Sequence, residues 1–410
     1  MDMAHLIRKE YLHVELDGTE AEALALQRTL SGVCRNHLAP AIERALDRSA
    51  PEAGHLVIER VEIDAGVLQL ERLESGLADS VEQALGKWLR EHVPLTGSPP
   101  APLQGSGPQR TAPGPVVGAL RHRSARDAAM EALVHFLRHG TLPWWFRPPA
   151  GKTLEQMIVE VWQEAGKAEL EAALAAHGIL AALAEGPAGI RLIRQFSPSF
   201  TATVLAAVAP EHRTVVAATY PAAPQEEVRS TRALSNSPQA EHPEAREGLY
   251  VGHAGLVLLH PFLPRFFAAL GIADEDRLLQ PERALCLLYY LATGQPAAPE
   301  YELVLPKILC GIPLPEPVSA DLALSGPEKE EAMALLEAVI AHWDALRSSS
   351  CDELRGAFLV RPGKVSLRDD GDWLLQVEAQ TCDILLDQLR WGLSMVKLPW
   401  MKRMLWVEWG

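Results

Sequence analysis

WGLSMVKLPWMKRMLWVEWG (residues 391–410) holds four of the ten tryptophans in the chain. Its last run, RMLWVEW, alternates with a period of two residues, which predicts a β-strand. Met404, Trp406 and Glu408 form one face of this strand, and Leu405, Val407 and Trp409 form the other. Because both faces carry large apolar side chains, we expect the strand to be buried in a sheet or in a partner protein. The preceding run, GLSMVKL, is a second predicted strand, so a sheet organises this part of the chain.

The rest of residues 249–410 is predicted to combine helices with a hairpin. KVSLRDDGDWLLQVE contains two alternating runs around Asp370 and Gly371, a residue pair that suits a tight turn. EKEEAMALLEAVIAHWDAL is a strong amphipathic helix, whose apolar face consists of Leu335, Val339, Trp343 and Leu346. Further helices are predicted in GHAGLVLLHPFLPRFFAALG, PERALCLLYYLATG and TCDILLDQL. Residues 249–410 are therefore predicted to form an α+β domain with a Trp-rich tail.

Residues 1–93 are predicted to form a small βαβα domain. HLIRKEYLHVEL (5–16), which alternates at Tyr11–Leu16, is the first predicted strand, and HLVIERVEIDAG (55–66) is the second. A capping-box pattern, T-E-A-E, begins at Thr19 and predicts the start of a helix. The two predicted helices extend from Thr19 to about Asp47 and from about Leu73 to His92.

Two segments poor in large apolar residues interrupt the chain. Residues 94–119 are a Pro/Gly-rich linker, and residues 211–248 are predicted to be a disordered linker. Between them, residues 120–210 contain short helical pieces such as ARDAAMEALVHFLRHG and AELEAALAAHG, which suggest a repeat-like array without a fixed period. The predicted fold class is mixed α+β, mostly α, with a helical-repeat middle, two folded ends and two disordered linkers.

The charge of the chain limits its expected partners. The formal net charge is −15 at pH 7, whereas phosphate binding needs clustered Lys and Arg, so we expect neither nucleic acid nor a membrane as a partner. No apolar run reaches the roughly eighteen residues of a membrane span, and the first residues lack the apolar core of a secretory signal. The five cysteines are scattered, which fits reduced thiols in a cytoplasmic protein.

The sequence contains no pattern that marks a catalytic or metal site. His135 and His139 lie four residues apart on one predicted helix face, but no third ligand is evident, so structural histidines are favoured over a metal site. The acidic cluster around Asp370 fits a turn better than a calcium loop. Cys310 has no marked base, which favours a buried apolar role over a nucleophile. We expect no catalytic residue and no cofactor; a hydrolase with a metal at His135 and His139 is the remaining enzyme alternative.

Aromatic side chains are the candidate interaction or core residues. An exposed Trp would mark a binding hot spot, whereas a buried one would be needed for folding. The candidates are Trp391, Trp400, Trp406, Trp409, Trp144, Trp145, Phe262 and Phe266. Lys397, Lys402 and Arg403 lie among the tail tryptophans, but the acidic charge of the chain argues against stacking on nucleic-acid bases.

Several blocks of the sequence resemble the contractile injection system tape measure protein family. The N-terminal blocks are IRKEYLHVELDGTEAEALALQRTLS and HLVIERVEIDAG, and those in the middle are LVHFLRHGTLPWWF and RLIRQFSPSFTATVL. The C-terminal blocks are GLVLLHPFLPRFFAALG, PERALCLLYYLATG, PEYELVLPKILCGIPLPEPV and WGLSMVKLPWMKRMLWVEW. Together they cover about two thirds of the chain in order.

The resemblance implies a structural component of a phage-tail-like contractile particle. A member of this family is expected to run inside the growing inner tube, to set its length, and to bind tube, baseplate or cap proteins at its ends, with self-association as a further option. It would be cytoplasmic during assembly and lie in the tube lumen afterwards. The alternative is an assembly adaptor or chaperone-like scaffold that tethers particle components or cargo without acting as a ruler.

The middle of this chain is short for a ruler. Residues 94–248 would span about 230 Å as a single helix, at about 1.5 Å per residue, and on the order of 510 Å when fully extended. Pro-rich linkers cannot be helical, and amphipathic helices should pack on one another. We therefore expect either a short ruler or one whose copies line up.

Overall fold

The structure of the chain is a computed structural model. It describes residues 7, 10–48, 55–58, 60–69, 72–92, 116–117, 120–149, 151–163, 167–184, 186–207, 242–296, 298–319 and 322–409. The chain divides into two compact units, an N-terminal unit (Met1–Ala128) and a C-terminal unit (Ala129–Gly410). The described elements are mostly helices with some strands, which confirms the predicted mixed, mainly helical class.

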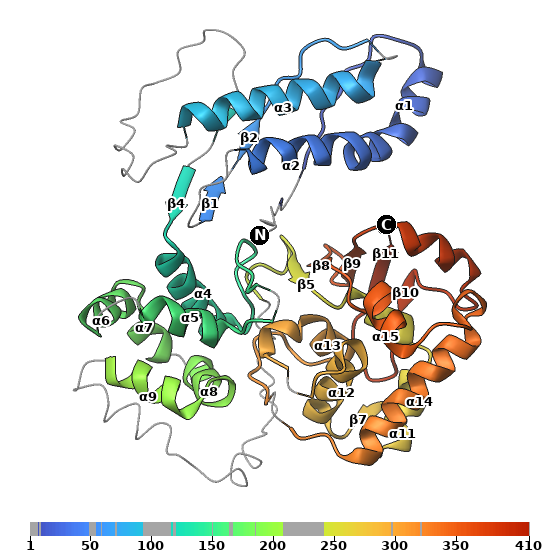
Figure 1. Ribbon diagram of the computed structural model, residues 1–410. Coiled ribbons are helices and arrows are strands. Elements are labelled where there is room, and N and C mark those ends of the chain that lie inside the picture. The colour runs from blue at the N-terminus through green and yellow to red at the C-terminus, as the bar shows by residue number, and fades with distance from the viewer. Residues whose placement is uncertain are drawn as a thin grey trace. The chain divides into compact units, whose positions relative to one another are not determined.

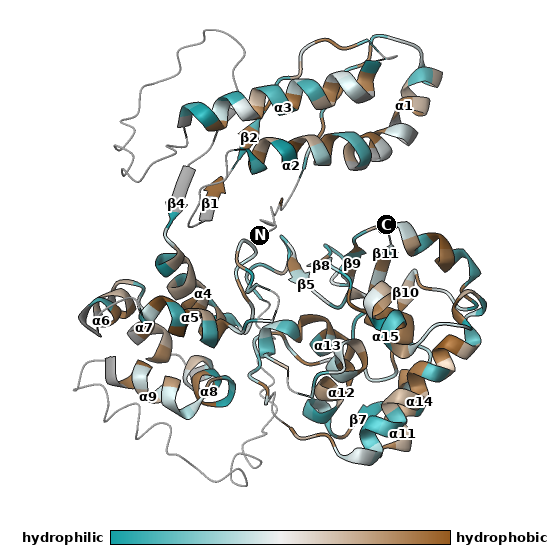
Figure 2. Cartoon of the chain, in the orientation of Figure 1, coloured by the Kyte–Doolittle hydropathy of each residue, from teal (hydrophilic) through white to brown (hydrophobic). Residues whose placement is uncertain are grey.

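The N-terminal unit combines long helices with two short strand pairs (Figure 1). Its elements are α1 (Glu20–Val33), the π-helical turn η1 (Cys34–Leu38), α2 (Ala39–Asp47), β1 (His55–Ile58), β2 (Val61–Glu62), α3 (Leu73–His92), β3 (Val116–Val117) and β4 (Leu120–Arg123). Helices α2 and α3 pack together through a buried cluster of Ala45, Leu85, Trp88 and Leu89. Figure 2 shows polar and apolar residues interspersed along α3, as expected for a helix with one buried face.

The start of α1 follows the predicted capping box. The backbone N–H of Thr19 donates to Glu22 Oε2 (2.7 Å), and the N–H of Glu22 donates to Thr19 Oγ1 (3.4 Å). These two bonds satisfy N–H groups that the first turn of a helix leaves without intrahelical partners.

The strands of this unit differ from the prediction. Residues 55–66 do not form one strand, because β1 pairs antiparallel with β4 while β2 pairs antiparallel with β3. Tyr11–Leu16 is not a strand at all: it has no regular secondary structure, and Tyr11 is 85% exposed. β1 and β2 take their partners from residues 116–123, and none of the described strands pairs with this alternating segment. β3 falls within the predicted linker, and residues 94–115 of that linker lie outside the described residues.

A series of short helices follows β4. They are α4 (Ala125–His139), α5 (Leu154–Gln163), α6 (Lys167–Ala176), α7 (Ile179–Ala184), α8 (Gly186–Gln195) and α9 (Pro198–Ala207). Their lengths vary from 6 to 15 residues. The predicted helical character of this region is confirmed, whereas its repetition stays a prediction.

The rest of the C-terminal unit alternates helices and strands. Its strands are β5 (Leu249–Val251), β6 (Ala273–Asp274), β7 (Arg277–Leu278), β8 (Gly363–Leu367), β9 (Trp373–Val377), β10 (Met395–Val396) and β11 (Leu405–Trp409). Its α-helices are α11 (Leu263–Ala269), α12 (Pro281–Thr293), α13 (Val304–Leu309), α14 (Gly326–His342) and α15 (Cys351–Leu354). Its 3₁₀ and π turns are η4 (Ala254–Leu259), η5 (Glu300–Glu302), η6 (Asp344–Leu346), η7 (Arg355–Leu359) and η8 (Thr381–Gln388).

The end of the predicted disordered linker is ordered. Residues 242–248 form turns, with His242 and Ala245 buried. The backbone N–H of Leu367 donates to the carbonyl of Ala245 (2.8 Å), which ties these turns to the end of β8. The prediction of disorder was wrong here because it was based on composition, which does not register such long-range hydrogen bonds. Residues 211–241 of the same linker lie outside the described residues.

The Trp-rich tail belongs to a five-stranded sheet with the order β10-β11-β9-β8-β5. β11 runs parallel to β9, and the other neighbouring pairs are antiparallel. The predicted hairpin is confirmed as β8 and β9. The predicted alternation of β11 is confirmed as well: Leu405 and Val407 are buried, while Glu408 is exposed and accepts a hydrogen bond from Gln376 (2.8 Å). This strand is therefore buried within the sheet of its own chain.

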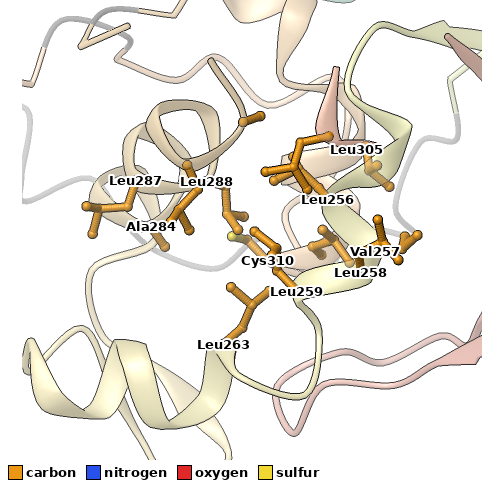
Figure 3. Close-up of a cluster of buried hydrophobic side chains, with 14 of the residues drawn as sticks. Leu256, Val257, Leu258, Leu259, Leu263, Ala284, Leu287, Leu288, Leu305 and Cys310 are labelled. Atoms are coloured by element: carbon orange, nitrogen blue, oxygen red, sulfur yellow. The ribbon is translucent and has the colours of Figure 1, made fainter. Parts of the chain in front are cut away.

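A hydrophobic core lies between the sheet and the helices of the C-terminal unit. Figure 3 shows part of it: Leu256, Val257, Leu258 and Leu259 of η4, Leu263 of α11, Ala284, Leu287 and Leu288 of α12, Leu305 of α13, and Cys310. The predicted apolar face of Leu335, Val339, Trp343 and Leu346 is buried in the same core. Burial raises the pKa of the Cys310 thiol, so the neutral thiol is favoured, in line with the apolar role expected from the sequence.

Gly255 marks the closest backbone packing in this core. A Cβ atom at this position would lie 1.7 Å from the carbonyl oxygen of Phe358 and 2.7 Å from the Cα of Leu359. Only glycine lets η4 lie this close to η7.

Candidate interaction site

Three charged side chains are buried together in the C-terminal unit. They are Arg191 of α8, Glu300 of η5 and Lys307 of α13 (Figure 1 labels both helices). Glu300 Oε1 accepts hydrogen bonds from Arg191 Nε (3.1 Å) and from Lys307 Nζ (2.6 Å), and no member of this ionic cluster is more than 2% exposed. Burial lowers the pKa of Lys307, while the Glu300 carboxylate opposes that shift. Two cations around one carboxylate leave excess positive charge, which carbonyl oxygens can compensate.

The ionic cluster holds a proline-rich loop by its carbonyl groups. This loop, GIPLPEPV (311–318), is called the proline loop below. Lys307 Nζ donates to the carbonyls of Leu314 (3.0 Å) and Glu316 (2.7 Å), and Arg191 donates to the carbonyl of Pro315. Proline has no N–H to donate, so a loop with three prolines is rich in acceptors that buried cations can satisfy.

Helix α8 contributes two further contacts to the same loop. Arg194 donates to the carbonyl of Pro317 (3.3 Å), and Gln195 donates to the carbonyl of Val318 (2.8 Å). The backbone N–H of Glu300 in turn donates to Gln195 (2.9 Å). The short helices after β4 are therefore fixed against the proline loop by several hydrogen bonds from one helix face.

Gly140 makes room for the ionic cluster at the end of α4. Its φ angle is +76°, and a Cβ there would lie 2.5 Å from Glu300 Oε1 and 3.0 Å from Arg191 Nε. Arg191 also donates to the carbonyls of Leu137 (2.9 Å) and Arg138 (2.8 Å), two of those that the last turn of α4 leaves without intrahelical partners. The glycine in the sequence and the hydrogen bonds from Arg191 therefore both mark the end of α4.

A half-buried arginine, Arg147, fixes the segment after α4. Arg147 lies over the ring of Tyr250, with its Cζ 3.1 Å from the ring centroid, in a close cation–π contact. Burial lowers the pKa of Arg147 to about 10, and the neighbouring Tyr250 and Glu302 oppose this shift. Trp144 and Trp145, which precede it, are half-buried, and Trp145 packs edge-on against Phe146 at 5.9 Å between centroids.

An open pocket lies on the proline loop. It is lined by His242, Ile308, Gly311, Ile312, Pro313, Leu314, Pro315, Trp373, Met401, Lys402 and Arg403. Trp373 begins β9, and residues 401–403 lie two residues or more before the start of β11, so the pocket joins the proline loop to the Trp-rich tail. Its lining combines apolar walls with two basic residues, which suits an apolar group that carries a negative charge nearby.

Three histidines lie close together beside this pocket. Ring centroids are 4.7 Å apart for His135 and His139, 5.4 Å for His139 and His242, and 6.3 Å for His135 and His242. The backbone N–H of Glu244 donates to His242 Nδ1 (3.2 Å), so the proton of the neutral ring is on Nε2 and is donated to Thr141 Oγ1 (2.8 Å). In the described part of the chain, no group of three His, Cys, Asp or Glu side chains is arranged to hold a metal ion.

Burial favours the neutral form of two of these histidines, His135 and His242. It lowers the pKa of both His135 and His242 to about 3, and for His242 the nearby His139, Arg191 and Lys307 lower it further. His135 and His242 therefore add no positive charge to the ionic cluster near neutral pH.

This burial predicts a loss of stability in acid. The pKa of His242 is about 6.5 in the unfolded chain and about 3 in the fold, so the unfolded state binds the extra proton and stability falls as pH drops through this window. We expect a contribution of about 3 kcal/mol to be lost between pH 6.5 and pH 4. Urea unfolding at several pH values should show a smaller loss for His242→Asn than for the parent. The exposed His342→Asn variant is the control, and identical pH profiles for parent and His242→Asn would contradict the assignment.

The tail tryptophans are half-buried, and three of them donate hydrogen bonds inside the unit. Trp391 donates to the carbonyl of Leu258 (3.0 Å), Trp400 to the carbonyl of Leu309 (2.8 Å), and Trp406 to Asp372 Oδ2 (3.3 Å). Trp409 lies beneath the Arg361 guanidinium at 5.5 Å, and its buried Nε1 has no hydrogen-bond partner among the described residues. These contacts tie the tail to the core of its own chain.

The two candidate phenylalanines lie on or near α11. Phe262, half-buried, packs edge-on against Trp391 (5.3 Å between centroids) and His342 (5.8 Å). Phe266 is 3% exposed and contacts Phe267 at 5.4 Å. None of the eight aromatic candidates is among the large apolar side chains that the described surface exposes.

Two indole groups give a matched test of these contacts. Trp400→Phe should lower the free energy of unfolding by about 1 kcal/mol, because the carbonyl of Leu309 loses its donor. Trp409→Phe should leave stability unchanged or raise it, because it removes a buried N–H that has no partner in the described structure. Chemical unfolding of both variants measures the difference, and a larger loss for Trp409→Phe would show that its N–H is satisfied in solution.

The sequence did not point to the ionic cluster or to the pocket. Arg191, Glu300 and Lys307 look like ordinary surface charges when read along the chain. A weak signal was present, since Glu300 and Lys307 lie seven residues apart within the apolar block PEYELVLPKIL. His242 was placed in the predicted disordered segment, so its approach to His135 and His139 could not be foreseen.

Comparisons with known proteins connect both units to one family. A family model described as contractile injection system tape measure protein matches residues 4–232 and 215–409. No curated protein and no solved structure gives a significant match. In the described part of the chain, no helix is both long and apolar enough to cross a membrane.

Proposed function

The chain belongs to the contractile injection system tape measure protein family, and from this premise we propose that it helps to set the length of the inner tube of a contractile particle. Its units would bind tube, baseplate or cap proteins, and copies of the chain could associate with one another. In this proposal the protein is cytoplasmic during assembly and lies in the tube lumen afterwards. No catalytic step is part of the proposal.

One observation supports a particular form of this function. The short helices after β4 are held against the proline loop by Arg191, Arg194 and Gln195, and against β5 by Arg147. The longest of them, α4, has 15 residues and so spans only about 22 Å at about 1.5 Å per residue. A chain folded in this way would add a fixed length per copy, as a stacked unit, and would not measure by its extended contour.

A second candidate is an assembly adaptor or scaffold that holds particle components or cargo without measuring length. It is favoured by the position of the predicted linkers. The elements on either side of residues 94–115, α3 and β3, belong to the N-terminal unit, and those on either side of residues 211–241, α9 and β5, belong to the C-terminal unit. Neither linker therefore connects one unit to the other. A simple extendable tape would need a linker that does.

Tube length measured by electron microscopy tests the proposal. Particles would be assembled with a chain in which the segment containing α4 to α9 is duplicated, beside the parent chain. The matched control carries a Gly/Ser-rich insert of equal length within residues 94–115, which adds contour length to a segment that begins and ends in one unit.

The three outcomes separate the candidates. Longer tubes with the duplication alone would support a ruler made of folded units. Longer tubes with both inserts would support measurement by contour length and would overturn the stacked form of the proposal. Unchanged length at normal particle yield with both inserts would favour the adaptor.

A further inference from the structure

The pocket on the proline loop has basic residues in its lining, although the chain as a whole is acidic. Lys402 and Arg403 form part of its lining, and none of the described residues that line it is acidic. Lys397 lies close to them, since its Nζ donates to the carbonyl of Lys402 (2.8 Å). The whole chain carries a net charge of −15. Basic side chains at the pocket attract a negatively charged partner, whereas the acidic net charge of the chain opposes its binding elsewhere.

The interior of the pocket is suited to an apolar side chain. Ile308, Leu314 and Met401 are buried, and Ile312 and Trp373 are half-buried, so the last two present apolar surface to solvent. A bare anion such as phosphate would gain nothing from these walls. An apolar group with an attached or adjacent carboxylate uses both the walls and the basic residues.

The pocket is formed before any partner binds. One wall is the proline loop, whose carbonyls are held by Lys307 and Arg191. The other is close to the first, because a Cβ on Gly311 would lie only 3.2 Å from the carbonyl oxygen of Trp400. A site with fixed walls loses little conformational freedom on binding, so a short peptide segment can bind it measurably.

We propose that this pocket binds an extended segment of a partner protein in which an apolar side chain is flanked by carboxylates. The apolar side chain enters between the proline loop and residues 401–403, and the carboxylates lie near Lys402 and Arg403. The identification of the partner as a component of the contractile particle rests on the proposed function. The chemistry of the bound segment rests on the pocket alone.

Peptide binding to the purified full-length chain tests the chemistry directly. The probe is a fluorescein-labelled pentapeptide with leucine at its centre and two acidic residues on each side. One control peptide has glycine in place of leucine, and another has lysine in place of the acidic residues. Fluorescence anisotropy should show binding of the first peptide and at least about tenfold weaker binding of both controls. Equal binding of the three peptides, or no binding of the leucine peptide at millimolar concentration, would overturn the proposal.

Charge reversal at the pocket locates the site. Lys402→Glu should weaken binding of the leucine peptide about tenfold or more at low salt, with a smaller effect at high salt. Arg265→Glu is the matched control, because Arg265 is exposed on α11 of the same unit and does not line the pocket. Equal effects of the two variants would place the peptide elsewhere and refute the assignment.

Photo-crosslinking in assembling particles identifies the partner. A photoreactive phenylalanine replaces Ile312, and mass spectrometry identifies the crosslinked peptide. An acidic segment with an apolar residue in a tube, baseplate or cap protein is the expected product, and its yield should fall in the Lys402→Glu background. A crosslink to a second copy of this chain, or to a segment without acidic residues, would overturn the choice of partner. Tube length is measured in the same particles, so the length-setting function can fail while the crosslink remains.

Discussion

Replacing Glu300 by glutamine is expected to lower the free energy of unfolding of the C-terminal unit by about 3–5 kcal/mol. The substitution keeps the size of the side chain but removes the one carboxylate that Arg191 and Lys307 share at 3.1 Å and 2.6 Å. Two buried cations would then face each other without a counter-charge, at a site where water cannot solvate them. Urea unfolding followed by tryptophan fluorescence and circular dichroism measures the loss.

The same substitution at Glu282 is the matched control. Glu282 pairs with Arg194 at 3.5 Å, but its side chain is 40% exposed, and that of Arg194 is 25% exposed. An ion pair in this position contributes at most about 1 kcal/mol, so Glu282→Gln should change stability little. If both glutamine variants unfold at the same urea concentration, the ionic cluster is not the anchor that its burial indicates.

Gly255→Ala is expected to have an effect of similar or greater size, a loss above about 4 kcal/mol. The added methyl group would lie 1.7 Å from the carbonyl oxygen of Phe358, which is less than half a normal contact distance. Its neighbours on that side are backbone atoms of η7, which cannot turn away as a flexible side chain can. Either η4 or η7 must therefore move, and both are part of the buried core.

Gly356→Ala separates this steric effect from the general effect of removing a glycine. Gly356 lies in η7 itself, and a Cβ there has no heavy atom within 4 Å. Gly356→Ala should leave the free energy of unfolding within about 1 kcal/mol of the parent. A small gain is expected, because alanine lowers the conformational entropy of the unfolded chain. Soluble yield and urea midpoints compare the variants. If Gly255→Ala and Gly356→Ala unfold at the same urea concentration, the close packing of η4 against η7 is contradicted.

Local sequence patterns predicted the elements of the C-terminal unit well. The period of two in RMLWVEW reports which side chains share a face, and Leu405 and Val407 are buried as that pattern requires. The spacing of Leu335 and Val339 likewise predicted the buried face of α14, and Trp343, which directly follows the helix, is buried with them. Periodicity is a local property of the backbone, so it can be read without knowing the partner of an element.

Pairing could not be predicted in the same way. Nothing in the sequence of β11 shows that it pairs parallel with β9, because a strand can accept several neighbours with similar side chains. Tyr11–Leu16 shows the reverse case: it has a strand pattern, yet it pairs with none of the described strands. A strand is stabilised by hydrogen bonds to a neighbour, and the neighbour is set by the whole fold.

The candidate site was hidden for a related reason. Buried charges such as Glu300 and Lys307 cannot be told from surface charges until their partners are known, and Arg191 lies 109 residues from Glu300 in the chain. The tryptophans were visible at once because of their size and number. These tryptophans anchor the tail to its own unit. The pocket, by contrast, is formed by the proline loop together with residues that no sequence motif identifies, including two basic side chains.

The position of β11 within the sheet has a consequence for synthesis on the ribosome. Residues 405–409 are translated after every other strand of that sheet, yet β11 is hydrogen-bonded to β10 on one side and to β9 on the other. A chain whose translation stops before Leu405 leaves those two strands without the one that joins them. Unfinished sheets expose strand edges and apolar surface, which chaperones and proteases recognise. The sheet of the C-terminal unit is therefore complete only once translation has passed through Trp409.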